Sequence, residues 1–135
     1  MTRRNSSLGF LGRFGRSEDL RRLDAALRDF DLHPALVPDG AKLAIVNMMK
    51  DAWPDREPPA EAYAPVASLF AYCLVGPDLF AQSNGPALAA EAEARIDAAL
   101  EAGDGMDADL ILLALHARLV SPKVVEKFGL TIEQE

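Results

Sequence analysis

Apolar residues recur at intervals of three and four positions through most of the chain, which is the periodicity of one face of an α-helix. The first such run follows Ser17, a residue type that often caps helix N-termini, and Glu18 and Asp19 suit a first turn. Its apolar face consists of Leu20, Leu23, Leu27 and Phe30. The pattern predicts a helix that starts at Ser17 and stops before Pro34, because a residue preceding proline avoids the α conformation.

Two further segments, residues 39–52 and 86–102, carry the pattern of amphipathic helices. The predicted inner face of the first consists of Ala41, Ala44, Ile45, Met48, Met49 and Ala52. The predicted inner face of the second consists of Leu88, Ala92, Ile96, Ala99 and Leu100. Gly103 is a natural stop for the second helix, and Glu91 and Arg95 are spaced to form a weak ion pair on it.

Residues 65–75 and 108–120 are apolar around most of the circumference that a helix would give them. A turn at residues 61–64 is expected to precede the first of these helices, and Asp107 to cap the second. Helices that are apolar on all sides are buried. We therefore expect these two to lie in the middle of the fold, covered by the amphipathic helices.

Two shorter elements complete the prediction. Residues 78–83 lie between two Gly-Pro pairs and are expected to form a single short turn. Ser121, followed by a proline, opens a last short helix that runs to Phe128 and is closed by Gly129.

The length and composition agree with a single helical domain. The chain has 135 residues, which suits one domain, and 50% of them are hydrophobic. β-Branched residues occur only as isolated pairs, and alanine, the strongest helix former, is abundant. We predict an all-α fold, an irregular or orthogonal bundle of about five helices with short helical turns, formed by residues 17–135.

Charge divides the chain into a basic segment and an acidic body. Residues 1–16 carry four arginines and no acid, whereas all 21 acidic residues lie in the remainder, which has a formal charge of −11. We expect residues 1–16 to form an arm that binds a partner or docks on the body, through Arg3, Arg4, Phe10, Arg13, Phe14 and Arg16. A plain disordered terminus is the alternative. The acidic body makes nucleic acid an unlikely partner, since it repels phosphate backbones.

We expect a bacterial-type protein, and its cysteine content fits a reducing cytoplasm. Cys73 is the single cysteine, so the chain has neither an internal disulfide nor a CxxC metal motif. The apolar runs at 65–75 and 110–115 are shorter than the roughly 20 residues that cross a bilayer, so we expect no transmembrane segment. Residues 1–16 also resemble a mitochondrial presequence in being rich in arginine and free of acid, which leaves that destination as an alternative.

The candidate ligand-binding residues are Ser68, Tyr72 and His116. Ser68 and Tyr72 are four residues apart, so a helix presents both hydroxyls on one face, where they are able to line a small pocket. His116 offers acid–base chemistry on the second central helix, and Cys73 would be the nucleophile of a catalytic version of this site. The favoured interpretation is nevertheless structural: the hydroxyls satisfy backbone groups or neighbouring helices, and Cys73 is an inert core thiol.

Two other patterns fall short of a site. Asp104, Asp107 and Asp109 lack the twelve-residue spacing and terminal glutamate of a calcium loop, and we expect no metal and no cofactor. Residues 107–131 resemble a helix-turn-helix, but no recognition helix follows them and the surrounding chain is acidic.

These features favour a non-enzymatic protein-interaction or accessory domain with an unknown protein partner, and a homodimer is compatible with them. A small-molecule-binding or catalytic bundle with a pocket near Ser68, Tyr72 and His116 is the main alternative. A third hypothesis is contact with a nucleic acid or membrane surface through residues 1–16.

Overall fold

A computed structural model describes residues 18–130 of the chain, and 78% of these residues are helical. No strand occurs within this range, so the all-α prediction is confirmed. The elements after the first helix, which covers residues 18–29, are η1 (Pro34–Leu36), α2 (Asp39–Ala52), η2 (Ala60–Ala62), α3 (Tyr63–Val75), α4 (Pro77–Asn84), α5 (Pro86–Ala102), α6 (Met106–His116) and α7 (Pro122–Phe128). Residues 1–16, the predicted arm, lie outside the described residues.

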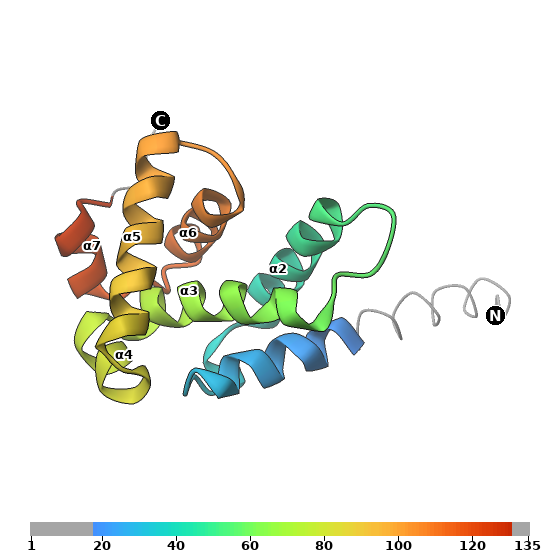
Figure 1. Cartoon of the computed structure of the whole chain (residues 1–135), viewed down its shortest axis with the longest axis horizontal. Helices are drawn as coiled ribbons and strands as arrows, with labels where there is room; N and C mark the ends of the chain where they lie inside the picture. Colours follow the sequence, from blue (N-terminus) through green and yellow to red (C-terminus); the bar gives the residue numbers. More distant parts are fainter. Residues whose placement is uncertain (1–17, 131–135) are drawn as a thin grey trace, which may run out of the picture.

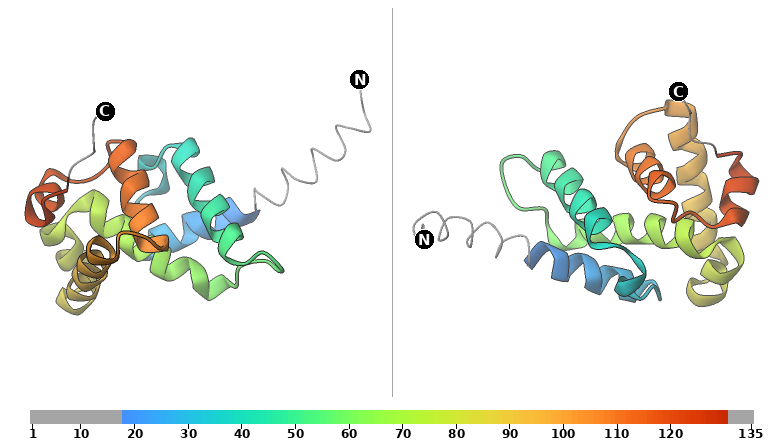
Figure 2. Two further views of the ribbon diagram at one scale, coloured as in Figure 1. Left: turned by 90° about the horizontal axis from the view of Figure 1, so that it is seen from above. Right: turned by 180° about the vertical axis from the view of Figure 1, so that it is seen from behind.

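Helix α3 is the central element, as its apolar circumference predicts. Every residue from Val66 to Cys73 is buried. Helices α4, α5 and α6 all contact α3. The first helix and α2 lie toward the Tyr63 end of α3, whereas α4, α5 and α7 gather at its Val75 end (Figures 1 and 2).

Helix α6 is only partly central, because its outer side is open to solvent. It buries Leu110, Ile111, Ala114 and Leu115 against α2, α3 and α5. Leu113 is half-buried, and Leu112 keeps 48% of its surface exposed. Helix α6 thus packs against three other helices, as expected of a second central helix, while part of its apolar surface stays exposed.

Helix α6 also ends four residues earlier than its apolar pattern predicts. Arg118 has φ 61°, a left-handed conformation, and the Leu119 N–H donates to the Ala114 carbonyl at 2.9 Å. These are the features of a Schellman motif, which normally places glycine at the left-handed position. The predicted end at Val120 was wrong because no glycine marks this turn.

The segment expected to form a short turn is a helix of eight residues, α4. Gly76 and Gly85 flank it with φ of 96° and 98°, and a proline follows each glycine as the first helical residue. Phe80 on α4 is fully buried, and its ring packs 5.5 Å from that of Tyr72 and 6.5 Å from that of Phe30. A helix of this length is only marginally stable by itself, so this aromatic packing contributes to its stability.

Helices α5 and α6 are joined by a charged clamp at Arg95. Its guanidinium donates to both carboxylate oxygens of Asp107, at 2.8 and 3.0 Å, and to the Pro65 carbonyl at 2.9 Å. Asp107 therefore pairs across helices, and the N-cap of α6 is Gly105, with no side-chain cap. Within residues 18–130, Arg95 thus pairs with Asp107 and forms no ion pair with Glu91, the partner that their spacing predicts.

Among the residues that the structure describes, no helix has both the length and the apolar character needed to cross a bilayer.

Candidate interaction groove

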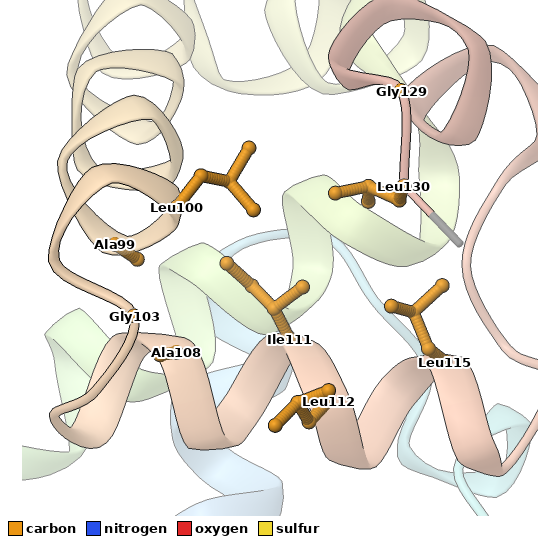
Figure 3. Close-up of a pocket in the computed structure, with 9 residues that line it drawn as sticks. All are labelled: Ala99, Leu100, Gly103, Ala108, Ile111, Leu112, Leu115, Gly129 and Leu130. Carbon is orange, nitrogen blue, oxygen red and sulfur yellow. The ribbon is translucent and has the colours of Figure 1, made fainter. Parts of the chain in front are cut away.

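An apolar groove opens between α5, α6 and the residues that follow α7. Its volume is about 280 Å³. Nine residues line it: Ala99, Leu100, Gly103, Ala108, Ile111, Leu112, Leu115, Gly129 and Leu130. In Figure 3, Leu100 and Leu130 point toward one another from opposite walls, and Ile111 rises between them from α6.

The groove has a buried floor and an exposed rim. Ile111, Leu115 and Leu130 are buried at its base, with 3%, 8% and 5% of their surface exposed. On the rim, Leu100 is 46% exposed and Leu112 is 48% exposed. These two are among the four large apolar side chains that stand exposed in the described part of the chain. Single exposed leucines are ordinary, but two that border one apolar hollow form a patch of the kind that marks an interaction site.

Glycines at two helix ends shape the walls. Gly103 ends α5 with φ 77°, and Gly129 ends α7 with φ 62°. A Cβ at either position would meet no atom within 4 Å, so it is the backbone conformation, and not space, that requires glycine. The turn at Gly129 directs Leu130 back onto the groove, where the Leu130 N–H donates to the Val125 carbonyl at 3.0 Å.

Acidic residues adjoin several groove residues of α5, α6 and their connection in the chain. Glu101, Asp104 and Asp109 are exposed and lie next to groove residues in the chain. The α7 side carries Lys127, also exposed. The lining residues themselves are leucine, isoleucine, alanine and glycine, so the groove offers contact area but no acid, base or nucleophile.

The structure places the three predicted ligand-binding residues in different surroundings. Ser68 and Tyr72 are buried within α3. The Tyr72 hydroxyl donates to the Glu93 carboxylate at 2.7 Å, and burial raises the pKa of Tyr72. His116 is exposed at the end of α6. None of the three lines the apolar groove, and a pocket shared by them stays a prediction.

Cys73 lies in the core beside the junction of α3 with the segment before α7. Its side chain is buried, and burial raises the pKa of the thiol to about 12. Its carbonyl accepts from the Ser121 N–H at 2.8 Å, while Ser121 caps α7 through the Lys123 N–H. A protonated, enclosed thiol is a weak nucleophile. These features agree with the inert core interpretation.

Within residues 18–130, no group of three or more His, Cys, Asp or Glu side chains is placed to hold a metal ion. The predicted arm residues Arg3, Arg4, Phe10, Arg13, Phe14 and Arg16 lie outside the described part of the chain.

A buried charged cluster was missed by the sequence analysis, which assigned Asp19 only to the first turn of a helix. Asp19 is 1% exposed and accepts from the Tyr63 hydroxyl at 3.1 Å. Its other oxygen forms an ion pair with the Lys50 ammonium at 2.9 Å. The Asp19 carboxylate raises the pKa of Lys50, and burial, with the charge of Asp19, raises the pKa of Tyr63 to about 12. The cluster joins the first helix to α2 and α3.

The groove was also missed, although one of its residues carried a signal. Leu100 was expected to face inward, and the structure shows it half-exposed on the groove rim. Leu112 lies on the side of α6 that a fully buried helix would have covered. The sequence signal for such a surface is a helix like α6, which has apolar residues on most sides and therefore more apolar surface than its neighbours cover.

Comparison with family models, with curated proteins and with solved structures finds no match for this chain.

Proposed function

We propose that this chain is a non-enzymatic protein-interaction domain that binds a partner segment in the groove between α5 and α6. The observation that carries the proposal is the pair of half-exposed leucines, Leu100 and Leu112, above a continuous buried apolar floor. Covering them removes apolar surface from water, which favours association by about 25 cal/mol per Å². A partner of complementary shape gains this energy without any rearrangement of the domain.

The shape and chemistry of the groove favour a protein segment over a small ligand. Its volume of about 280 Å³ lies just below the roughly 300–1,000 Å³ of sites for drug-sized molecules. Such sites also place a few polar groups that fix the orientation of a ligand, and the lining here has no polar side chain. Interface anchors, by contrast, are apolar or aromatic side chains that enter apolar pockets.

Charge supports a protein partner over nucleic acid. The exposed acids Glu101, Asp104 and Asp109 beside the groove repel phosphates and attract basic groups. We place this interaction in a reducing bacterial cytoplasm, which suits a chain whose single cysteine is a buried free thiol. The alternative of a pocket near Ser68, Tyr72 and His116 lacks such support, because the Tyr72 hydroxyl is already bonded to Glu93.

The proposal is tested by comparing what three forms of the full chain retain from an extract of the native cell. The forms are the wild type, a groove variant (Leu100→Glu and Leu112→Glu) and a control variant (Leu36→Glu). Leu36 is 61% exposed and does not line the groove, so the control adds a carboxylate to an exposed leucine elsewhere. We expect a protein that the wild type and the control retain and the groove variant loses. Equal retention by the groove variant and the wild type would exclude the groove as the binding site.

A further inference from the structure

The chain contains a segment whose composition complements the groove, and the inference drawn from it rests on the proposed function. The groove needs apolar side chains for its floor and favours basic groups beside Glu101, Asp104 and Asp109. Residues 1–16 offer both, through Phe10, Phe14 and four arginines.

The apolar residues of this segment are closely spaced. Phe10 and Phe14 are four residues apart, and Leu8 and Leu11 are three residues apart. Residues at these spacings are neighbours on one face of a helix, so a helical segment is able to direct both phenylalanines into one hollow. Aromatic side chains are the preferred anchors of protein interfaces, and the lining residues Leu100, Ile111 and Leu130 offer them an apolar surface.

The arginines flank the apolar residues on both sides. Arg3 and Arg4 precede them, and Arg13 and Arg16 accompany Phe14. The segment carries +4 and the remainder of the chain −11, so attraction between them is the expected long-range interaction. The competing segment, residues 131–135, follows directly after Leu130 but carries two glutamates and no basic residue, so repulsion from the exposed acids Glu101, Asp104 and Asp109 disfavours it.

The position of the groove favours a segment from a second copy of the chain. The first described residues are held at the Tyr63 end of α3, where Asp19 bonds to Tyr63. The groove lies toward the opposite end of the molecule, with α5 and α7 (Figures 1 and 2). Phe14 is only four residues before residue 18, a span of at most about 14 Å when extended. In the same chain the segment would have to pass around the body, whereas a second copy meets no such restriction.

We propose that the groove of one copy binds residues 1–16 of a second copy, with Phe10 and Phe14 as the anchors. A second, reciprocal contact closes the pair into a symmetric dimer. The expected homodimer is thus held together by exchanged N-terminal segments and not by the association of two flat faces. Any other partner of the groove would have to compete with this segment.

The test measures self-association of the full chain by sedimentation, using two variants that disable opposite sides of the contact. The segment variant (Phe10→Ser and Phe14→Ser) keeps every arginine, and the groove variant (Leu100→Glu and Leu112→Glu) changes only exposed side chains. We expect the wild type and the Leu36→Glu control to dimerise. Each variant alone should raise the dimer dissociation constant by at least about a hundredfold, since two buried aromatic anchors are lost or excluded.

Mixing the two variants separates exchange between copies from docking within one chain. The segment variant retains an intact groove and the groove variant retains intact phenylalanines, so a mixture should form a heterodimer through one contact. Circular dichroism and melting of each variant establish that it is folded. A wild type that stays monomeric, variants that dimerise as well as the wild type, or a mixture that shows no heterodimer would each overturn the proposal.

The outcome also distinguishes this inference from the proposed function. If the chain is monomeric but another protein is retained through Leu100 and Leu112, the groove is an interaction site and the second copy is not its occupant. If the chain dimerises regardless of both variants and no retained protein depends on the groove, both proposals fail.

Discussion

The buried cluster around Asp19 makes a specific prediction about the replacement of Lys50 by methionine. Lys50→Met keeps most of the side-chain length and apolar stem but removes the ammonium that lies 2.9 Å from Asp19. The carboxylate, which is 1% exposed, then keeps only the hydrogen bond from Tyr63 and the more distant Arg22, at 3.8 Å. The variant therefore leaves a buried charge with little compensation.

The size of the effect follows from the burial of each partner. Removing one member of a fully buried ion pair costs about 3–5 kcal/mol, because the remaining charge stays out of water. Lys50 is 37% exposed, so part of its attraction to Asp19 is screened by solvent. We expect Lys50→Met to lower the free energy of unfolding by about 2–3 kcal/mol.

A matched control is provided by Lys123, which pairs with Asp78 at 3.0 Å on the surface. Both members of this pair are mostly exposed, at 68% and 78%. Lys123→Met makes the same chemical change at nearly the same distance, but it should cost at most about 1 kcal/mol. Urea denaturation followed by far-ultraviolet circular dichroism measures both values.

A rescue experiment tests the cause of the loss. In the double variant Asp19→Asn with Lys50→Met, the buried charge is gone and the amide oxygen is still able to accept from the Tyr63 hydroxyl. This double variant should be more stable than Lys50→Met alone by about 1–2 kcal/mol. Equal costs for Lys50→Met and Lys123→Met, or no recovery in the double variant, would refute the reasoning.

Three further predictions follow from burial, backbone conformation and ionisation. Leu69→Ala, in the centre of α3, should cost about 2–5 kcal/mol, whereas Leu112→Ala on the groove rim should cost less than about 1 kcal/mol; equal losses in urea denaturation would contradict the assignment of α3 as the core helix. Arg118→Gly should raise stability by about 0.5–1 kcal/mol, because glycine adopts the left-handed conformation without steric cost, and a lower melting temperature would argue against it. Folding raises the pKa of Cys73 from 9.0 and that of Tyr63 from 10.0, each to about 12. The stability that these two groups contribute to the folded state is fully present below pH 9. The free energy of unfolding then falls as the pH rises toward 12, by up to about 1.4 kcal/mol per pH unit for each group. Between pH 9 and 10 the thiol of the unfolded wild type ionises first, so Cys73→Ala should reduce the loss of stability with pH in this range. An unchanged dependence of the free energy of unfolding on pH would contradict the assignment of this loss to Cys73.

Much of the helical framework follows from the sequence, because residue types with a direct effect on the backbone mark several of the helix boundaries. The segment that begins after Pro38 and ends at Ala52 is a helix as predicted, and so is the segment from Pro86 to Ala102 that Gly103 closes. Proline at a first position and glycine in a left-handed turn need no tertiary contact to act. The end of α6 at His116 was not predictable in this way, because the left-handed residue there is Arg118.

The candidate site depended on tertiary packing, which periodicity does not encode. Spacing places Leu100 with the inward residues of α5, and only the position of α6 and Leu130 shows that it borders a groove. Asp19 is equally ordinary in sequence, since a carboxylate in a first turn suits any helix. Its burial against Tyr63 and Lys50 arises from the docking of three elements that are distant in the chain.

Photo-crosslinking at the groove rim tests the central claim most directly. A photoreactive amino acid of benzophenone type replaces Leu112 in one form of the full chain and Leu36 in another, so that both probes start from exposed leucines, one in the groove and one outside it. After irradiation in the native cell, the account predicts a discrete protein adduct at position 112, either a second copy of the chain or another protein, that is missing at position 36. No adduct at position 112, or the same adducts at both positions, would contradict the assignment of this groove as the binding surface.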